Sequence, residues 1–285
     1  IEQATGWAGI GILPWFADAR SLPAEDILDL SSKTGDTNVR GGADVLHIAV
    51  PVLRRIANFD DLDPLAAEPG VRLTLVAAGE AIPGDADLIL LPGSKATIDD
   101  LKFLHDQGWD IDIKAHVRRS GMVMGLCGGY QMLGTEVSDP HGIEGEASRV
   151  AGLGLLSVKT EIGQTKTLNL VTGSSQHFGT GVTGYEIHMG RTDGADCRRP
   201  VMEIEGRPEG ASSPDGRIIG SYVHGIFSSN DFRTAFLADL AARRNKSVEL
   251  GTVDFAGNVD AILDQLASHL AQHLDMDALA EIAGL

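Results

Sequence analysis

The chain has 285 residues, of which 43% are hydrophobic and 22% charged, a composition that supports a substantial core and excludes the fibrous and disordered classes. Lys and Arg total 23 against 40 for Asp and Glu, and the resulting net charge of −17 opposes nucleic acid or an anionic membrane surface as the main partner. Two cysteines, Cys127 and Cys197, make no disulfide framework, which favours a reducing, cytoplasmic location.

The chain opens with an apolar run, "GWAGIGILPWFA", that has no basic region before it and contains Pro14. It is shorter than the ~20 residues that a membrane span needs, so we expect a buried strand and turn. Because the chain begins with Ile1 inside this pattern, we expect a piece of a longer polypeptide. The polar, Gly-rich segment 31–42 is typical of a linker. We therefore predict one small part at 1–35 and a large domain at 42–285.

Four short, nearly continuous apolar runs follow the linker, at residues 43–51, 71–79, 86–93 and 121–129. Runs of this kind are typical of strands covered on both faces. The segments between them, among them "FDDLDPLAAE", carry helical spacing. The first half therefore predicts an α/β fold with a mainly parallel, twisted sheet flanked by helices.

The second half has a different pattern. From about 140 to 220, apolar runs such as "GLGLLSVKT", "TLNLVTG" and "GYEIHMG" are separated by polar turns, which indicates antiparallel strands. From 230 onward, two long segments have helical spacing, the first with Asn230 or Asp231 as a possible cap. We expect these helices to form a layer packed on the sheet.

Cys127 stands in "GLCGGYQMLG", where a strand-like run ends and a helical pattern begins. A nucleophile on a sharp strand-to-helix turn needs small neighbours, and the amides of the helix favour its thiolate form. The alternative is a small hydrophobic residue in the core, the usual place of free cysteines. Cys197 has no such turn around it, and we interpret it as structural.

A catalytic thiolate needs a base, and the chain has nine histidines. His224 ends the strand-like run "RIIGSYVHGIF" and is the best candidate, with His188 as its rival. Gly93 follows another buried run and precedes a helix, so its backbone N–H and that of Gly128 could hold an oxyanion. An ordinary turn capped by Ser94 or Thr97 is the alternative for the Gly93 segment.

Four separated motifs, "LPGSKATIDDL", "GLCGGYQMLG", "GYEIHMGRT" and "SYVHGIF", together resemble the class I glutamine amidotransferases, and within them the cobyric acid synthase branch. The resemblance implies the α/β fold of that class and glutamine as substrate. It implies Cys127 as the nucleophile, His224 as the base and Gln131 as a substrate-binding residue. It also implies the Gly93 and Gly128 amides as the oxyanion donors.

The same resemblance implies that ammonia passes to a separate synthetase domain, where ATP and Mg²⁺ activate carboxylates of a corrinoid in cobalamin biosynthesis. Residues 1–30 are similar to the tail of that upstream domain. No G-x-x-x-x-G-K-[ST] phosphate loop occurs in the chain, so we expect no cofactor in this portion. Taken alone, the chain is expected to hydrolyse glutamine and not to amidate a corrinoid.

One position departs from many class I amidotransferases, which carry a Glu two residues after the catalytic His, where this chain has Ile226. Glu186 is a possible third catalytic group if its strand runs beside that of His224. The alternatives are a cobyrinic acid a,c-diamide synthase, an isoglutaminyl synthase, an unrelated cysteine hydrolase and a non-catalytic docking module. A metal site from Cys127, His188 and His224 is the weakest, because no short Cys/His spacing supports it.

Overall fold

The computed structural model describes residues 2–23, 44–251 and 253–285. The predicted linker at 31–42 lies outside these residues. Contacts divide the chain into two compact units, one made of Ile1–Ala24 with Asp254–Leu285 and the other of Glu25–Val253. We call the described residues of the first the terminal unit, and those of the second the sheet unit.

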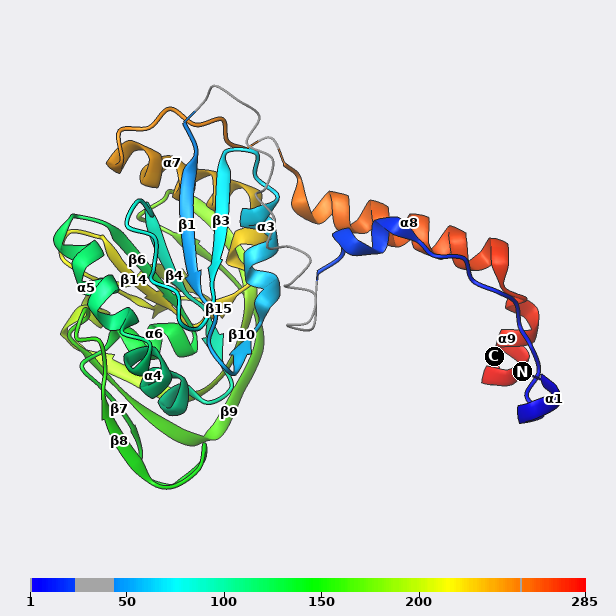
Figure 1. Cartoon of the computed structure of the whole chain (residues 1–285), viewed down its shortest axis with the longest axis horizontal. Helices are drawn as coiled ribbons and strands as arrows, with labels where there is room; N and C mark the ends of the chain where they lie inside the picture. Colours follow the sequence, from blue (N-terminus) through cyan, green and yellow to red (C-terminus); the bar gives the residue numbers. More distant parts are fainter. Residues whose placement is uncertain (1, 24–43, 252) are drawn as a thin grey trace. The chain divides into compact units, whose positions relative to one another are not determined.

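The sheet unit is built around a six-stranded sheet with the order β13-β14-β6-β4-β1-β3 (Figure 1). Its strands are β1 (Leu46–Pro51), β3 (Val71–Val76), β4 (Leu88–Leu91), β6 (Met122–Leu126), β13 (Ala211–Ser212) and β14 (Ile218–Ser221). All neighbours are parallel except β13 and β14. The four apolar runs of the first half thus became β1, β3, β4 and β6, which confirms the predicted mainly parallel sheet.

Successive side chains of the central strands enter different cores. Ile48 and Val50 of β1 join one cluster, whereas Ala49 joins the other. This period of two is what a strand buried on both faces requires. It explains why the sequence shows unbroken apolar runs at these strands.

Helices cover the central sheet on both faces. The first cluster takes in α7 (Asn230–Arg243), and the second takes in α4 (Thr97–Asp106), α5 (Trp109–Arg118) and α6 (Gly128–Leu133). Figure 1 shows α4, α5 and α6 grouped together and α7 apart from them. The helix predicted from residue 230 onward is α7, and its cap position is Ser229 rather than Asn230 or Asp231.

A second, mainly antiparallel sheet follows, as the pattern of the second half predicts. Its strands are β7 (Glu136–Asp139), β8 (Ser148–Ala151), β9 (Val158–Ser175), β10 (Thr180–Gly194), β11 (Met202–Ile204), β12 (Arg207–Glu209) and β15 (Val223–His224). The runs "GLGLLSVKT" and "TLNLVTG" contribute to one long strand, β9, because β10 pairs with it along its length, with one register shift between Met189 and Arg191. The short elements β2 (Ile56–Ala57), η3 (Phe59–Leu62), α3 (Asp63–Ala66), β5 (Gly93–Ser94), η4 (Ala195–Arg198) and η5 (Ile226–Ser228) complete the unit.

The terminal unit consists of α1 (Glu2–Thr5), η1 (Ala17–Ser21), α8 (Phe255–His273) and α9 (Met276–Ala283). Its N-terminal segment runs along α8 (Figure 1) and bridges Gly11 to Leu274. The buried strand expected at residues 6–17 is not found, since Trp7 and Trp15 are 78% and 74% exposed. Of the C-terminal helices expected to pack on the sheet, α7 does so, whereas α8 and α9 belong with the N-terminal segment to the other unit. Among the described helices, none has the length and hydropathy needed to cross a membrane.

Candidate active site

Cys127 lies on the turn that joins β6 to α6. Its φ and ψ are 50° and −107°, a backbone conformation that costs energy in any residue but glycine. The turn closes tightly, since a methyl group on Gly129 would lie 2.2 Å from the Leu91 carbonyl oxygen. The Cys127 N–H donates to the Ser221 carbonyl at 2.8 Å, which fixes the turn to the neighbouring strand β14. The predicted strained elbow is therefore present.

His224 is delivered to the same sheet edge by β14 and β15. β14 runs parallel to β6, with Ser221 beside Leu126, so the residues that follow each strand meet. The imidazole is fully buried, and its Nδ1 lies 2.6 Å from the Oδ2 atom of Asp61. The other carboxylate oxygen of Asp61 accepts the Gly225 N–H at 2.6 Å. Asp61, in η3, therefore orients both the ring and the backbone that carries it.

The charge of His224 is set by its burial and by two neighbouring side chains. Burial lowers its pKa, but the Asp61 carboxylate and then the Cys127 side chain raise it, with a net increase to about 10. Nε2 is buried and makes no hydrogen bond of ordinary geometry with the described residues. Cys127 thus lies close enough to act on the charge of the imidazole, with the second nitrogen available for proton transfer.

Two further contacts restrain the imidazole ring. Tyr185 of β10 stacks on it with ring centroids 5.4 Å apart and an angle of 22°. A methyl group on Gly93 would lie 3.1 Å from its Cε1 atom, so Gly93 of β5 also lies against the ring. Tyr185 is itself held by a 2.8 Å hydrogen bond from Asn58. The ring is therefore positioned by residues of three separate chain segments.

The amides near Cys127 come from α6 and from the short strand β5. The Lys95 N–H donates to the Arg55 carbonyl, so the alternation of an antiparallel ladder makes Ala57 and Gly93 the next hydrogen-bonded pair. Ser94 occupies the intervening position, and the ladder does not use its N–H. A methyl group on Gly128 would lie 2.8 Å from the Ser94 nitrogen. The amides of Ser94 and Gly128 are therefore close neighbours, and the Gly93 and Gly128 amides as oxyanion donors stay a prediction.

Gln131 lies in α6, one turn after Cys127, and its side chain is buried. Its Oε1 accepts from Thr97 at 2.7 Å, and its Nε2 donates to the Met189 carbonyl and to the Tyr222 hydroxyl, each at 3.3 Å. These contacts join α6 to α4 and β10. They give Gln131 a structural role beside Cys127, and its binding of substrate stays a prediction.

His188, the rival base, lies in β10 and is held differently. Its ring stacks on Tyr222 with centroids 3.8 Å apart, and its Nδ1 lies 3.2 Å from the Gly190 carbonyl oxygen. Burial lowers the pKa of His188, so the neutral form is favoured. The Cys127 Sγ contacts the adjacent Ile187 carbonyl at 3.6 Å. The aspartate partner and the interaction with Cys127 both belong to His224 and not to His188.

Glu186 meets the geometric condition set for it, because β10 pairs with β15 and Glu186 lies opposite Val223. Its carboxylate, however, forms an ion pair with Arg207. The position beside the imidazole is taken by Asp61, which sequence reasoning missed. The stretch "FDDLDPLAAE" carried acidic residues and helical spacing, but nothing in it indicated which carboxylate would reach a histidine 163 positions away.

Cys197, interpreted as structural, lies in η4 with its Sγ 3.8 Å from the Tyr130 hydroxyl. Among the described residues, no group of three or more His, Cys, Asp and Glu side chains is arranged to hold a metal ion.

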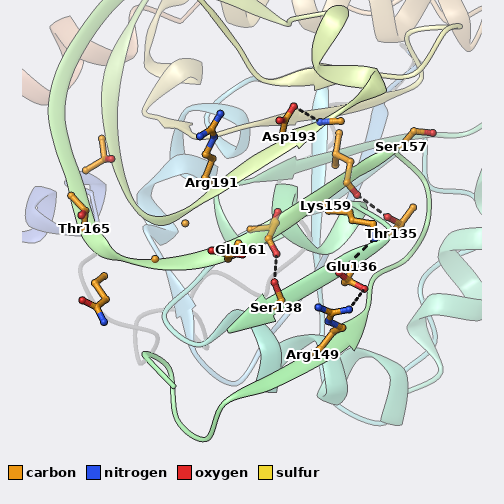
Figure 2. A pocket seen from close by; sticks show the side chains of 17 residues that line it. Thr135, Glu136, Ser138, Arg149, Ser157, Lys159, Glu161, Thr165, Arg191 and Asp193 are labelled. Atoms are coloured by element: carbon orange, nitrogen blue, oxygen red, sulfur yellow. Dashed lines mark hydrogen bonds and ion pairs between the residues drawn. The ribbon is translucent and has the colours of Figure 1, made fainter. Parts of the chain in front are cut away.

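A groove of about 1040 Å³ lies on the second sheet (Figure 2). It is lined by β7, β8, β9 and β10, with Arg149 directed toward Glu136. Neither Cys127 nor His224 lines it. Its end at Gly190 comes near the site, since a methyl group there would lie 3.2 Å from the Gln131 Nε2 atom. The candidate catalytic side chains therefore lie at the turn at Cys127 and not in this groove.

A cysteine on a strained elbow, facing a histidine–aspartate pair at the edge of a mainly parallel sheet, defines a protein of the class I glutamine amidotransferase type. Residues 47–232 match the CobB/CobQ-like glutamine amidotransferase domain, and the chain belongs to that family.

Curated relatives match nearly the whole chain. The cobyric acid synthase of Jannaschia sp. (strain CCS1) is 52% identical over 282 residues, and that of Rhodobacter capsulatus is 53% identical over 287. Each match covers 99% of this chain but 56% of the relative. The chain thus spans a little more than half the length of these relatives.

A solved structure supports the fold. PurLQS from Thermotoga maritima aligns with a TM-score of 0.52 and 16% identity, covering 70% of this chain and 99% of that one. At this identity the likeness concerns the fold alone, and it agrees with the predicted class I amidotransferase-like architecture.

Proposed function

We propose that this chain hydrolyses glutamine through a Cys127 thioester and supplies the ammonia to an amidating enzyme. The observation that carries the proposal is the Asp61–His224 pair, whose 2.6 Å contact orients an imidazole whose pKa is also raised by the Cys127 side chain. A buried core cysteine would need neither the strained turn nor this pair. The arrangement is that of an activated nucleophile with an oriented base.

The first half of the reaction forms the thioester. The Cys127 thiolate attacks the side-chain carbonyl carbon of glutamine, and the N–H groups of Ser94 and Gly128 stabilise the oxyanion that forms. The carbon–nitrogen bond then breaks, and the His224 imidazolium donates its Nε2 proton to the departing ammonia. Asp61 keeps the ring in the tautomer and orientation that this transfer requires.

The second half releases glutamate. His224, now neutral, accepts a proton from a water molecule, whose oxygen attacks the thioester carbon. The carbon–sulfur bond breaks, and the thiolate and imidazolium are restored. The sum is one glutamine and one water converted to glutamate and ammonia, with no cofactor needed in this part of the protein.

The finer assignment is to the glutaminase portion of a cobyric acid synthase. The support is the identity of 52% and 53% to two proteins of that name over 99% of this chain. By this assignment the ammonia reaches a synthetase domain in the remaining part of the protein, where ATP and Mg²⁺ activate corrinoid carboxylates. The setting proposed for this biosynthetic reaction is the cytoplasm.

The glutaminase step is tested with the electrophilic glutamine analogue 6-diazo-5-oxo-norleucine. We expect it to label Cys127 irreversibly, and we expect Cys127→Ser to abolish both labelling and glutamate release. Cys197→Ser is the matched control and should retain both. Glutamate release that survives Cys127→Ser would refute the mechanism, and a Cys127 that stays unlabelled would favour a non-catalytic docking module.

The substrate assignment needs the longer protein that contains this chain. With glutamine, ATP and Mg²⁺, it should amidate adenosylcobyrinic acid a,c-diamide. Amidation of cobyrinic acid only at the a and c positions would instead identify a cobyrinic acid a,c-diamide synthase. Amidation of a glutamate residue in a cell-wall precursor would identify an isoglutaminyl synthase.

A further inference from the structure

The terminal unit has a feature that the glutaminase chemistry does not explain: it has no core. No described residue of α1, α8 or α9 is buried. The sheet unit, in contrast, contains two clusters of fully buried side chains. Because burial of apolar surface is what offsets the entropy of ordering a chain, these helices need a partner surface.

Large apolar side chains of the terminal unit are turned to solvent. They are Trp7, Ile12, Leu13, Trp15, Leu263, Met276, Ile282 and Leu285. Ile12 and Leu285 are 87% and 97% exposed. Exposure of so many large apolar side chains, at both ends of the chain, is typical of an interface that has been left open.

The two ends of the chain nevertheless hold each other. The Asp275 N–H donates to the Ile10 carbonyl at 2.7 Å, and His269 Nε2 lies 3.0 Å from the Pro14 carbonyl oxygen. Phe16 packs on the His269 ring with centroids 5.3 Å apart. The N-terminal segment and α8 therefore form one ordered piece that presents a shared surface.

The apolar spacing of α8 also indicates a surface that needs a partner. Val259, Ile262, Leu266 and Leu270 follow the spacing of one helix face and are only half-buried, and Leu263 beside them is 47% exposed. Ala261 and Asp264 lie on the opposite face. The helix is amphipathic, and the N-terminal segment covers only part of its apolar stripe.

The relatives indicate what covers the rest. They match 99% of this chain, yet a little under half of each relative lies outside the match. A segment of that size is large enough to form a domain with its own core. The relatives thus contain a region large enough to cover a surface of this kind.

We propose that the terminal unit docks on the synthetase part of the protein, so that the sheet unit is tethered to that part through both of its ends. The inference rests on the proposed function for the identity of the docking partner. In this arrangement the C-terminal helices complete the synthetase part, and the sheet unit is, in the sequence, an insertion between the two segments of the terminal unit.

Hydrogen exchange tests the proposal by comparing the 285-residue chain with the longer protein that contains it. We expect the amides of α8 and α9 to exchange about 100-fold more slowly in the longer protein, because docking removes them from local opening. The amides of β1, β4 and β6 should exchange equally in both. Equal exchange of α8 and α9 in the two proteins would overturn the proposal.

A pair of variants in the longer protein makes the test specific. Leu263→Asp should return the exchange of α8 to the rate of the shorter chain, and Ala261→Asp, which places the same charge on the opposite face, should not. If instead the shorter chain alone shows protection of α8 that rises with protein concentration and is lost in Leu263→Asp, the surface binds a second copy, and the proposal fails. Labelling of Cys127 reports on the proposed function separately, so each idea can fail without the other.

Discussion

The Nδ1 atom of His224 and the Oδ2 atom of Asp61 are 2.6 Å apart, although the residues are 163 positions apart in the chain. Asp61 also accepts the Gly225 N–H, so both of its oxygens are used in placing His224. No glutamate stands two residues after the histidine, where this chain has Ile226. The carboxylate that orients the base therefore comes from a different part of the fold.

Asp61→Asn should convert His224 from a charged to a neutral residue at pH 7. Removal of the carboxylate takes away the main attraction that holds the pKa of His224 at about 10, and burial then lowers it. An asparagine also favours the wrong tautomer, so kcat for glutamine hydrolysis should fall about 10²- to 10⁴-fold. The His224 Cε1–H resonance should not titrate between pH 6 and 8 in the parent protein and should no longer report a charged ring at pH 7 in the variant.

Glu186→Gln is the control for Asp61→Asn. Its carboxylate pairs with Arg207, so we expect kcat to stay within about threefold of the parent and His224 to remain charged. A large fall in kcat for Glu186→Gln, together with a small one for Asp61→Asn, would show that the third group has been misassigned.

Much of the fold could be read from the sequence because its signals are local. A strand buried on both faces needs an unbroken apolar run, and an elbow needs small residues around its nucleophile, so β6, Cys127 and α6 were evident. His224 followed from its place at a strand end. The orienting carboxylate could not be read in this way, because Asp60, Asp61 and Asp63 form one acidic stretch and only tertiary packing selects among them.

The N-terminal segment shows a second limit. Its apolar run predicted a buried strand, yet Trp7 and Trp15 are exposed. Apolar patterning reports that a segment is to be covered, but it does not say which part of the protein covers it. The proposed docking of the terminal unit reconciles the pattern with the exposure.

Gly93→Ala should impair catalysis by displacing the imidazole. The added methyl group would lie 3.1 Å from His224 Cε1 and 3.0 Å from the Ala57 carbonyl oxygen, so one of these neighbours must move. We expect kcat to fall about tenfold or more, since small misplacements of a base are costly. Gly84→Ala is the matched control, because nothing lies within 4 Å of its added methyl group. Steady-state glutaminase assays and circular dichroism would check activity and folding, and full activity in Gly93→Ala would contradict this placement of His224.

Glu209→Gln should change how stability depends on pH. Burial raises the pKa of Glu209 to about 7, above its ordinary value of 4.5, so the folded protein favours the protonated form. Between those two pH values the unfolded chain releases the proton and the folded chain keeps it, so Glu209 destabilises the fold increasingly as pH rises. The glutamine variant lacks this effect. Its free energy of unfolding relative to the parent should rise by about 3 kcal/mol from pH 4 to pH 8, measured by urea unfolding.

That result would also concern the candidate active site, because Glu209 is linked to the turn at Cys127 through Ser221. It accepts the Ser221 hydroxyl at 2.9 Å and the Tyr222 N–H at 2.7 Å, and the Ser221 carbonyl holds the Cys127 N–H. A difference in stability that stays constant from pH 4 to pH 8 would mean that Glu209 is not buried in this way.

Arg233→Met should destabilise the sheet unit because it leaves a buried charge without its partner. Arg233 and Glu68 are both fully buried and 2.8 Å apart, and Arg233 also donates to the Phe227 carbonyl at 2.6 Å. Loss of one member of such a pair costs about 3–5 kcal/mol. Arg243→Met, in the same helix, removes a partly exposed pair with Asp239 and should cost less than about 1 kcal/mol.

The double variant Arg233→Met with Glu68→Leu separates the two parts of this cost. Once no buried carboxylate remains, the free energy of unfolding should recover by about 2 kcal/mol or more relative to Arg233→Met alone, since apolar replacements of a buried pair are often tolerated. Denaturant unfolding of the four proteins in this cycle would measure the recovery. If the two substitutions were simply additive, the loss in Arg233→Met would come from its contacts with η5 and not from the stranded charge of Glu68.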